Sequence, residues 1–426
     1  MRLTVTPSRL SGLVTIPGSK SHTIRAVAIA SLASGVSRIL APLDSADTRA
    51  AVDVYRLAGA GISLSSDVWT VNGTGGAIAP PSAPADVRNS GTTFNLSMGS
   101  FALLRDGKAI LTGDEQIQRR PSGPLISSLN DLGASVVSLK TNDCAPVEVR
   151  GRLRGGSTSM KAVSSQYLSS LLINAPLADG DAHVAVPLLN EAPYVRMTLA
   201  WLRESGIKVD HAADLSEFVI PGGQFYPPFA RRVPADFSSA TFFLAAGALA
   251  RNEITLAGLD INDTQGDKAV VDYVRAMGAH VEFADAGIVV RAGALRAATL
   301  DLNATPDALP MMAVLACFAE GRTTLANVPQ ARIKETDRIA VMARELGKMG
   351  GKVRELPDGL SIDESPLRGA AVDGHGDHRV VMALAVAGTA ATGKTTIEGA
   401  EAAGVTFPTF FDAMKSLGAR FVLTQS

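Results

Sequence analysis

The chain repeats one pattern six times, and this periodicity limits its fold more than any other feature of the sequence. Helical stretches rich in Ala and Leu end at six Gly or Asn residues, namely Gly35, Gly107, Gly180, Asn252, Gly321 and Gly393. Successive members lie 69 to 73 residues apart. Gly and Asn accept the left-handed backbone that closes a helix, so each is predicted to be a C-terminal cap. A strand-like run such as EITLA or TTLAN follows each one.

A second helix in each copy ends on a second periodic marker. The closing residues are Gly59, Gly133, Gly206, Gly278, Gly350 and Gly418. Each precedes a further strand-like run, so one copy is predicted to have the order β-α-β-α-β(β). This period is longer than that of common solenoid arrays, so each copy is a small fold of its own.

Six such copies suit two domains of three copies each. Pro- and Gly-rich segments mark the crossings near residues 16–18 and 226–234. We therefore predict one domain from residues 18–234, inserted into a second domain formed by residues 1–17 and 235–426. The N-terminal strand is expected to belong with the second half of the chain.

Composition narrows the classes of partner. Apolar residues make up 46% of the 426 residues, and 40 Lys and Arg balance 41 Asp and Glu. This balance favours neither nucleic acid nor an anionic membrane as partner, while a small anion needs only a local group of cations. The start MRLTVTPSRL has no apolar signal core, so a cytoplasmic location is expected. A monomer is also expected. The two cysteines predict no disulfide framework, and Cys317 is expected in a core.

The first helix of each copy opens with small or polar residues that suit an N-cap. Capping alone does not explain the cations near these starts, which are Lys20, Arg25 and Arg379. A cation at a helix start opposes the helix dipole, but it is favourable where an anion binds to the free N–H groups. Converging starts of this kind predict a trap for phosphate and carboxylate groups.

Further cations lie near the second helices, in residues 119–121 (RRP) and 332–338 (RIKETDR). Arg holds a carboxylate or phosphate with two parallel hydrogen bonds. The second run also fits a solvated helical face with local ion pairs. If they lie among these cations, Asp307 and Glu335 are candidates for proton transfer.

Two other motifs are rejected. Residues 388–395 match the nucleotide P-loop pattern, but a helix is predicted before them and a strand after them, the reverse of a P-loop. His375, His378, Asp373 and Asp377 fit an acidic, Gly-rich turn better than a metal site. No other cluster with metal-ligand spacing is present in the sequence, so no metal site is expected.

The chain resembles the 3-phosphoshikimate 1-carboxyvinyltransferases, or EPSP synthases, among the enolpyruvyl transferases. The shared motifs run in order along nearly the whole chain: PGSKS, NSGTT, LTGDEQIQRRPSGPL, SSQYLSSLL, DFSSATFFLAAGAL, TPDALPMMAVLACFAEG, RIKETDRIAVMARELGKMG and DHRVVMALAVAG. The resemblance implies a two-domain inside-out α/β barrel of six βαβαββ repeats, three per domain, with the active site in the interdomain cleft. It also implies transfer of the enolpyruvyl group of phosphoenolpyruvate to shikimate 3-phosphate, without a metal or an organic cofactor.

The resemblance also implies site residues. Asp307 is the implied base, with Glu335 and Lys20 in proton transfer. Contacts to the acceptor are implied for Lys20, Ser21, Arg25, Ser164, Ser165, Gln166, Tyr194, Asp307 and Lys334. Contacts to phosphoenolpyruvate are implied for Lys20, Gly91, Arg120, Gln166, Glu335, Arg338, His378 and Arg379.

The chain departs from the family pattern at several pocket positions. Asn95 and Val405 replace expected cations, Glu191 replaces a Ser, Gln330 replaces an Asn, and Ile24 replaces another Asn. A lost charge-assisted hydrogen bond costs about 1.5–3 kcal/mol. Arg105 and Arg196 are candidates to compensate. Alternatively, the chain acts on a different cyclitol, shikimate-like or sugar acceptor, or is a non-catalytic ligand-binding relative.

Overall fold

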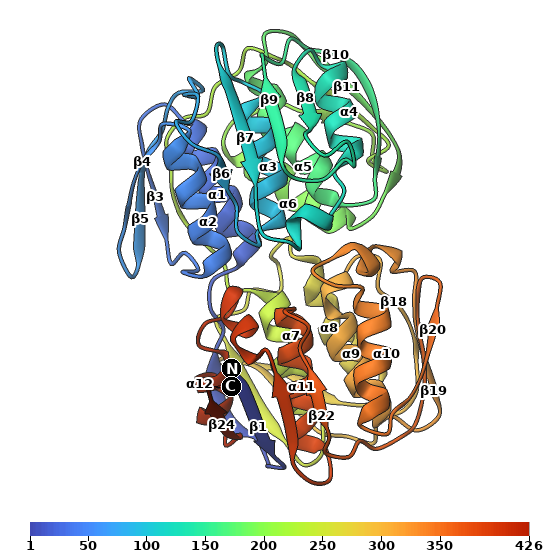
Figure 1. The fold of residues 1–426 in the computed structure, drawn as a ribbon. Helices are drawn as coiled ribbons and strands as arrows, with labels where there is room; N and C mark the ends of the chain where they lie inside the picture. The colour runs from blue at the N-terminus through green and yellow to red at the C-terminus, as the bar shows by residue number, and fades with distance from the viewer. Residues whose placement is uncertain (426) are drawn as a thin grey trace. The chain divides into compact units, whose positions relative to one another are not determined.

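The computed structural model describes residues 1–425, and the chain divides into two compact units (Figure 1). Unit 1 contains Met1–Pro17 and the chain from Ala235 onward, and unit 2 contains Gly18–Pro234. Within residues 1–425, each unit holds three four-stranded sheets and three copies of the repeat. The predicted six-fold α/β repeat is therefore confirmed.

The sheets of unit 2 have the orders β14 (Ala230–Arg232), β3 (Val36–Leu40), β5 (Val68–Asn72), β4 (Gly61–Leu64); β6 (Ala85–Asp86), β7 (Lys108–Thr112), β9 (Val147–Arg150), β8 (Ser135–Ser138); and β10 (Gly156–Ala162), β11 (Ala182–Leu189), β13 (Glu217–Ile220), β12 (Asp210–His211). Those of unit 1 have the orders β16 (His280–Ala284), β17 (Gly287–Arg291), β15 (Glu253–Ala257), β2 (Ser11–Thr15); β18 (Thr299–Asp301), β19 (Arg322–Ala326), β21 (Gly359–Asp363), β20 (Lys352–Leu356); and β22 (Ala371–Asp373), β23 (Thr395–Glu398), β1 (Arg2–Thr6), β24 (Arg420–Thr424).

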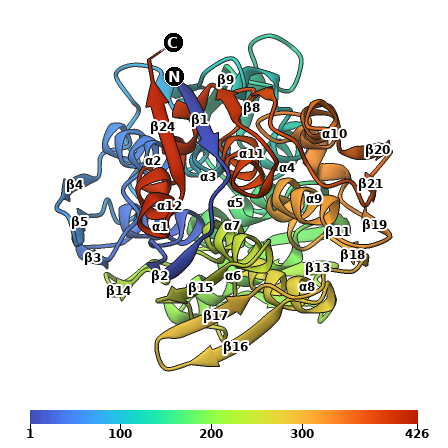
Figure 2. The ribbon, with the colours of Figure 1, turned by 90° about the horizontal axis from the view of Figure 1, so that it is seen from below.

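In each of the six sheets of the described chain, one outer pair of neighbouring strands is parallel and the other two pairs are antiparallel. Strands distant in sequence complete three of them. Strand β14 joins β3, β2 joins β15, and β1 lies between β23 and β24. Figure 2 shows β1 beside β24. These additions cover edges that would otherwise present unpaired backbone groups. The N-terminal strands β1 and β2 thus pair with strands from the second half of the chain.

The helices fall into two sets. The first helix of each copy is α1 (Lys20–Leu32), α3 (Gly91–Phe101), α5 (Ser165–Asn174), α7 (Phe237–Ala248), α9 (Leu309–Cys317) or α11 (His378–Ala390). The second is α2 (Ala46–Leu57), α4 (Gly123–Asp131), α6 (Ala192–Glu204), α8 (Val270–Ala276), α10 (Arg338–Lys348) or α12 (Phe410–Ser416). Short 3₁₀ turns are η1 (Ile117–Arg119), η2 (Ala175–Leu177), η3 (Gly266–Ala269), η4 (Pro306–Ala308), η5 (Pro329–Ile333) and η6 (Ala400–Val405).

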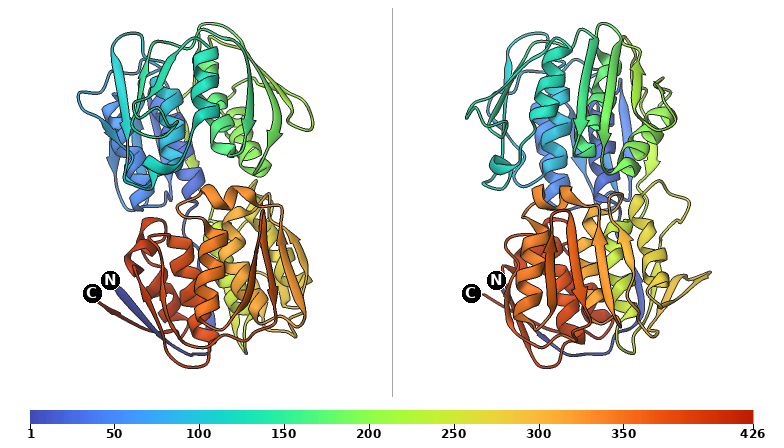
Figure 3. Two further views of the ribbon diagram at one scale, coloured as in Figure 1. Left: turned by 45° about the vertical axis from the view of Figure 1, so that its right-hand side comes forward. Right: turned by 90° about the vertical axis from the view of Figure 1, so that its right-hand side faces the viewer.

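The first helices form the centre of each unit. Every residue of α7 and α9 is buried, and α7, α9 and α11 contact one another in unit 1. In unit 2, α3 contacts both α1 and α5. Helices apolar on all sides require burial on all sides, which explains why the sheets lie outside them (Figure 3). Cys317 lies in this core, as predicted.

The second helices all end in the same cap. Gly59, Gly133, Gly206, Gly278, Gly350 and Gly418 have positive φ angles. After each Gly, the next N–H donates to a carbonyl in the last helical turn, as in Ala60 to Tyr55 and Ala419 to Met414. This is the Schellman arrangement, so the predicted caps of the second helices are confirmed.

The caps predicted for the first helices are only partly right. Gly35, Gly107, Gly321 and Gly393 have positive φ, but Gly180 and Asn252 do not. In the fourth copy Ala250 takes the left-handed conformation instead, with φ 53°. The Asn252 side chain accepts from Leu10 N–H and donates to the Ala246 carbonyl. Its role is thus to join neighbouring segments rather than to reverse the chain.

The segment 388–395 consists of the end of α11 followed by β23, which agrees with rejection of a P-loop. The run 332–338 is not a solvated helical face, because α10 begins only at Arg338 and Asp337 caps it. Within residues 1–425, no helix is both long and apolar enough to cross a membrane.

Candidate active site

In unit 1, the guanidinium of Arg338 lies among three carboxylates. Its Nη1 is 2.7 Å from Oδ1 of Asp307, and its Nε is 2.8 Å from Oδ2 of Asp377. Its Nη2 donates to Oε2 of Glu335. The side chain of Arg338 is 1% exposed. One buried cation therefore joins the two predicted proton-transfer residues to the start of α11.

The electrostatics of this cluster are strongly coupled. Burial by itself lowers the pKa of Arg338, but the charges of Asp377, Glu335 and Asp307 outweigh burial and raise it above its usual value. Burial by itself raises the pKa of Asp377, and the charge of Arg338 reverses this effect, so the pKa of Asp377 is lowered. Both groups are therefore ionised at neutral pH.

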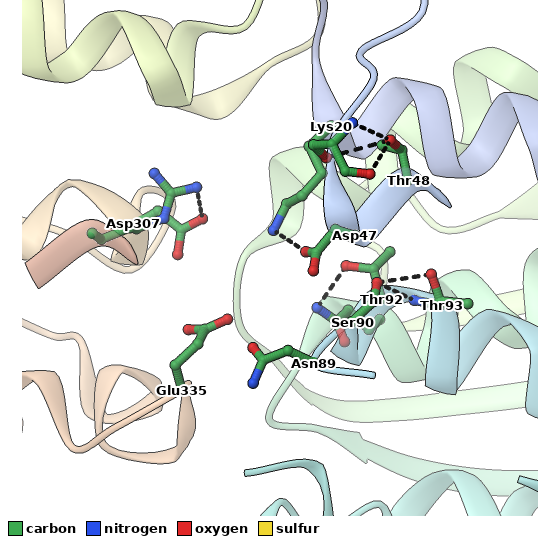
Figure 4. A network of polar contacts seen from close by, with 12 residues as sticks. Lys20, Asp47, Thr48, Asn89, Ser90, Thr92, Thr93, Asp307 and Glu335 are labelled. Carbon is green, nitrogen blue, oxygen red and sulfur yellow. Dashed lines mark hydrogen bonds and ion pairs between the residues drawn. The ribbon is translucent and has the colours of Figure 1, made fainter. Parts of the chain in front are cut away.

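Asp307 lies between two guanidinium groups. Its Oδ1 contacts Arg338, and its Oδ2 lies 2.8 Å from Nη2 of Arg379. Both Arg side chains are buried, whereas Asp307 is 18% exposed. Figure 4 shows the paired carboxylate of Asp307 and, from a separate segment, the carboxylate of Glu335. A carboxylate fixed on both oxygens by buried cations is well oriented to accept a proton.

The start of α11 is built by Asp377. Its Oδ1 accepts from the N–H groups of Arg379 and Val380, while its Oδ2 accepts from Arg338 and from the hydroxyl of Thr336. This cap places His378, which is buried, and Arg379 in the first turn of the helix. Lys334 lies between η5 and α10 and is half-buried.

In unit 2, Lys20 begins α1 and its Nζ lies 3.2 Å from Oδ2 of Asp47 in the first turn of α2, as Figure 4 shows. Lys20 is 14% exposed and Asp47 is 6% exposed. Asp47 was not a predicted site residue. The helix dipole favours an acidic residue in the first turn of any helix. The position of Asp47 in the sequence therefore does not indicate that it pairs with Lys20.

Three further predicted residues of unit 2 come together: Gly91, Arg120 and Gln166. A Cβ added to Gly91 would lie 2.9 Å from Nη1 of Arg120 and 3.7 Å from Oε1 of Gln166. The amide of Asn95 donates to that Oε1 at 2.8 Å, and its own oxygen accepts from Ser122 at 2.9 Å. Asn95 thus stands where a cation was expected, and its uncharged amide joins α3 by hydrogen bonds to α5 and to the loop after Arg120.

Arg25 is held entirely inside unit 2. Its donors bind Thr198 Oγ1 at 2.8 Å, Ser169 Oγ at 3.2 Å and the carbonyls of Ser21 and Tyr194 at 3.1 and 3.2 Å. Its pKa is lowered to about 10, chiefly by burial, against the opposing charges of Tyr194 and Glu191. These bonds use four of the five N–H donors of the Arg25 guanidinium. Arg25 thereby ties Ser21 on α1 to Tyr194 on α6.

Glu191 occupies the start of α5. Its Oε2 accepts from the backbone N–H of Ser165 at 3.1 Å and from the Ser165 hydroxyl at 2.6 Å. Glu191 is 2% exposed and its backbone is left-handed, with φ 59°. Ser164 caps the helix by accepting from Gln166 N–H. In the structure an internal carboxylate therefore sits where the sequence predicted a bound anion.

The other departures are uncharged and mostly buried. Gln330 donates to the carbonyl of Asn303 at 3.0 Å and is 2% exposed, and Ile24 is fully buried in the core of unit 2. Val405 ends η6. Within the described chain, no group of three or more His, Cys, Asp or Glu is arranged to hold a metal ion. His375 instead contacts Glu345, with its Nε2 2.9 Å from Oε1.

Known proteins show the same pattern along the whole chain. A family model described as EPSP synthase (3-phosphoshikimate 1-carboxyvinyltransferase) matches residues 5–414. A protein of that enzyme name from Ruminiclostridium cellulolyticum is 49% identical over 423 residues, covering 99% of this chain and 100% of the relative. Another of that name, from Acetivibrio thermocellus, is 50% identical over 419 residues, covering 98% and 99%.

Solved structures agree with the sequence relatives. An EPSP synthase from Acinetobacter baumannii superposes with a TM-score of 0.83 at 26% identity, covering all of both chains. The enolpyruvyl transferase NikO from Streptomyces tendae has a TM-score of 0.78 at 20% identity, covering 100% and 99%. The second likeness supports the fold alone. The match of residues 5–414 and the full-length relatives show that this chain belongs to the EPSP synthase (3-phosphoshikimate 1-carboxyvinyltransferase) family.

Proposed function

We propose that the protein transfers the enolpyruvyl group of phosphoenolpyruvate to the 5-hydroxyl of shikimate 3-phosphate and releases inorganic phosphate. The observation that carries this proposal is the arrangement of Asp307, which is fixed by Arg338 and Arg379 beside Glu335. This arrangement combines a proton acceptor with buried cations, as a reaction between two anionic substrates requires.

The proposed chemistry assigns each group a step. Asp307 takes the proton of the acceptor's 5-hydroxyl group as the oxygen of that hydroxyl adds to C2 of phosphoenolpyruvate. In the same stage C3 of phosphoenolpyruvate receives a proton. Phosphate then leaves C2, and C3 gives up a proton to restore the double bond. Glu335 and Lys20 are the proposed carriers of the C3 proton. The cations Lys20, Arg120, Arg338 and Arg379 stabilise the charge that develops on carboxylate and phosphate oxygens.

The binding assignments extend this proposal. Phosphoenolpyruvate is assigned to Gly91, Arg120, Gln166, Glu335, Arg338, His378 and Arg379 together with Lys20. The acceptor is assigned to Lys20, Ser21, Arg25, Ser164, Ser165, Gln166, Tyr194, Asp307 and Lys334. The contact of Gly91, Arg120 and Gln166 within unit 2 supports the grouping of these three on one ligand.

Release of inorganic phosphate tests the reaction. Mixing the protein with millimolar phosphoenolpyruvate and shikimate 3-phosphate is expected to release one phosphate per enolpyruvyl product, measured by a coupled phosphate assay and by mass spectrometry. Omitting either substrate is the control. Absence of turnover with both substrates present would refute the proposal.

Glu191 favours a second candidate, an enolpyruvyl transferase that acts on a less phosphorylated cyclitol or sugar. Its carboxylate already accepts both donors of Ser165, and a phosphate placed there would meet a like charge. A neutral hydroxyl group at the same place could donate a hydrogen bond to the carboxylate of Glu191.

Substitution of Glu191 by Ser distinguishes the two acceptors. If the phosphorylated acceptor is not the native one, Glu191→Ser is expected to tighten binding of shikimate 3-phosphate, because it removes a negative charge that repels the phosphate. The expected effect is roughly tenfold in Kd, which corresponds to about 1.4 kcal/mol. Isothermal titration calorimetry measures this effect, with substitution of the exposed Glu217 on β13 by Ser as the matched control. Unchanged or weaker binding would count against the second candidate.

A further inference from the structure

Glu345 is a buried carboxylate to which the proposed reaction gives no role. It lies on α10, its side chain is fully buried, and it accepts four hydrogen bonds. Its Oε2 accepts from Lys348 Nζ at 2.7 Å and from the backbone N–H of Asp373 at 3.0 Å. Its Oε1 accepts from His375 Nε2 at 2.9 Å and from Arg344 Nε at 3.1 Å.

Two of these donors belong to the turn that joins β22 to α11. Asp373 ends β22, and His375 has a left-handed backbone with φ 52°. Such a conformation is unfavourable for His and persists where surrounding contacts hold it. A carboxylate only accepts, so a hydrogen bond to Glu345 places the hydrogen on Nε2 of His375. Nη2 of Arg344, which only donates, also lies 3.0 Å from this Nε2 and 3.4 Å from Nδ1 of the same ring.

The same turn is fixed at its other end by Arg338, which binds Asp377. Arg338 and Glu345 are seven residues apart on α10, about two helical turns, so they lie on one face of the helix. Helix α10 contacts both β22 and α11. The turn is therefore attached to a single helix face at residues 373–375 and again at 377, directly before His378 and Arg379.

The turn is also tightly packed from the other side. The N–H of Gly374 donates to the carbonyl of Glu398, and a Cβ added to Gly374 would lie 2.2 Å from a methyl carbon of Val381. Lateral movement toward α11 or β23 is thus blocked, so the contact with Glu345 sets how far the turn lies from α10.

We infer that Glu345 and His375 form a clamp that positions the start of α11, and with it His378 and Arg379, for phosphoenolpyruvate. Glu345 is a positioning residue, since it acts through the turn and not on substrate. The assignment of phosphoenolpyruvate to this helix start rests on the proposed function. The hydrogen bonds support a permanent anion here, because they outweigh burial and lower the pKa of Glu345 to about 2.

Hydrogen exchange tests the clamp independently of activity. In Glu345→Gln, which keeps the shape but removes the charge, amide exchange in residues 373–380 is expected to accelerate about tenfold. Exchange in α9 and β15 is expected to stay unchanged. His375→Asn tolerates the left-handed backbone and shortens the donor, so it is expected to give a smaller acceleration in the same segment. Unchanged exchange in residues 373–380, or a uniform change across unit 1, would overturn the inference.

Kinetics test the consequence for the reaction. Glu345→Gln is expected to raise the KM for phosphoenolpyruvate about tenfold, with less than a twofold change in the KM for shikimate 3-phosphate. His375→Asn is expected to lie between it and the unaltered protein. Glu282→Gln removes an exposed ion pair with Arg291 on β17 and is the control with unchanged kinetics. Equal changes in both KM values would contradict a positioning role. A smaller fraction of folded protein with both KM values unchanged would contradict it as well. If the unaltered protein lacked turnover, the proposed function would fail while the exchange result still decided the clamp.

Discussion

Asp307→Asn is expected to lower kcat by roughly 10²–10⁴-fold, the usual contribution of a general base. Asn keeps the size of the side chain and can still accept from Arg338 through its oxygen. It cannot take up a proton, and it offers Arg379 an amide in place of a second carboxylate oxygen. The expected loss is therefore in turnover rather than in folding.

Steady-state kinetics and circular dichroism together measure this result. The far-UV spectrum of Asp307→Asn is expected to match that of the unaltered protein, and its KM for shikimate 3-phosphate is expected to change by less than kcat. Asp285→Asn, in the exposed turn between β16 and β17, is the matched control. Near-normal turnover in Asp307→Asn would remove Asp307 from the role of base.

Arg338→Met is expected to destabilise unit 1 by about 3–5 kcal/mol, because it removes the cation that pairs with the fully buried carboxylate of Asp377. Asp377 is fully buried, Glu335 is 11% exposed and Asp307 is 18% exposed. Turnover is also expected to vanish, since two proposed proton carriers lose their common partner. Arg338→Lys keeps the charge but not the three-way fork, so it is expected to restore part of the stability and little of the activity.

The chain contains a convenient internal control for this measurement. Trp69 and Trp201, the two tryptophans of the sequence, both lie in unit 2, so tryptophan fluorescence reports that unit while far-UV circular dichroism reports both. In urea, Arg338→Met is expected to shift a transition seen by circular dichroism and to leave the fluorescence transition in place. Arg322→Met, which removes an exposed pair with Asp363, is expected to cost less than about 1 kcal/mol. A loss of similar size in both variants would contradict the account of Arg338.

The effect of Arg338→Met also depends on pH. The pKa of Asp377 is lowered in the folded protein, so the stability it contributes is present above its unfolded pKa of about 3.9 and is lost as pH falls. Without Arg338, burial of Asp377 favours the protonated form. The difference in stability between the two proteins is therefore expected to be largest near pH 7 and to shrink toward pH 4.

Much of the fold could be predicted because its signals are local. A Gly that follows a helix adopts a positive φ for reasons contained in a few neighbouring residues, and six such residues recur at one period. The exceptions show the limit of that reasoning. Asn252 has the residue type of a cap, yet its side chain bonds Leu10, which is distant in sequence, and Ala250 turns the chain.

Part of the site could be predicted for the same reason. Polar residues at helix starts and cations beside them are visible in the sequence, and Asp377, Ser90 and Ser164 do cap their helices. The partners of these groups were not visible. Asp47 beside Lys20 and Glu345 beside His375 come from other helices or turns, at separations that no periodicity marks.

The sequence by itself thus determined the six α/β repeats, their closing turns, the family, and the residues at the helix starts. Only the tertiary structure decided which charges meet: Arg338 with three carboxylates, Arg25 with four internal acceptors, and Glu191 with the start of α5. The physical reason is range. Caps and periodic helices depend on neighbours within one or two turns, whereas the pairing of a buried charge depends on which distant segments packing brings within hydrogen-bond distance.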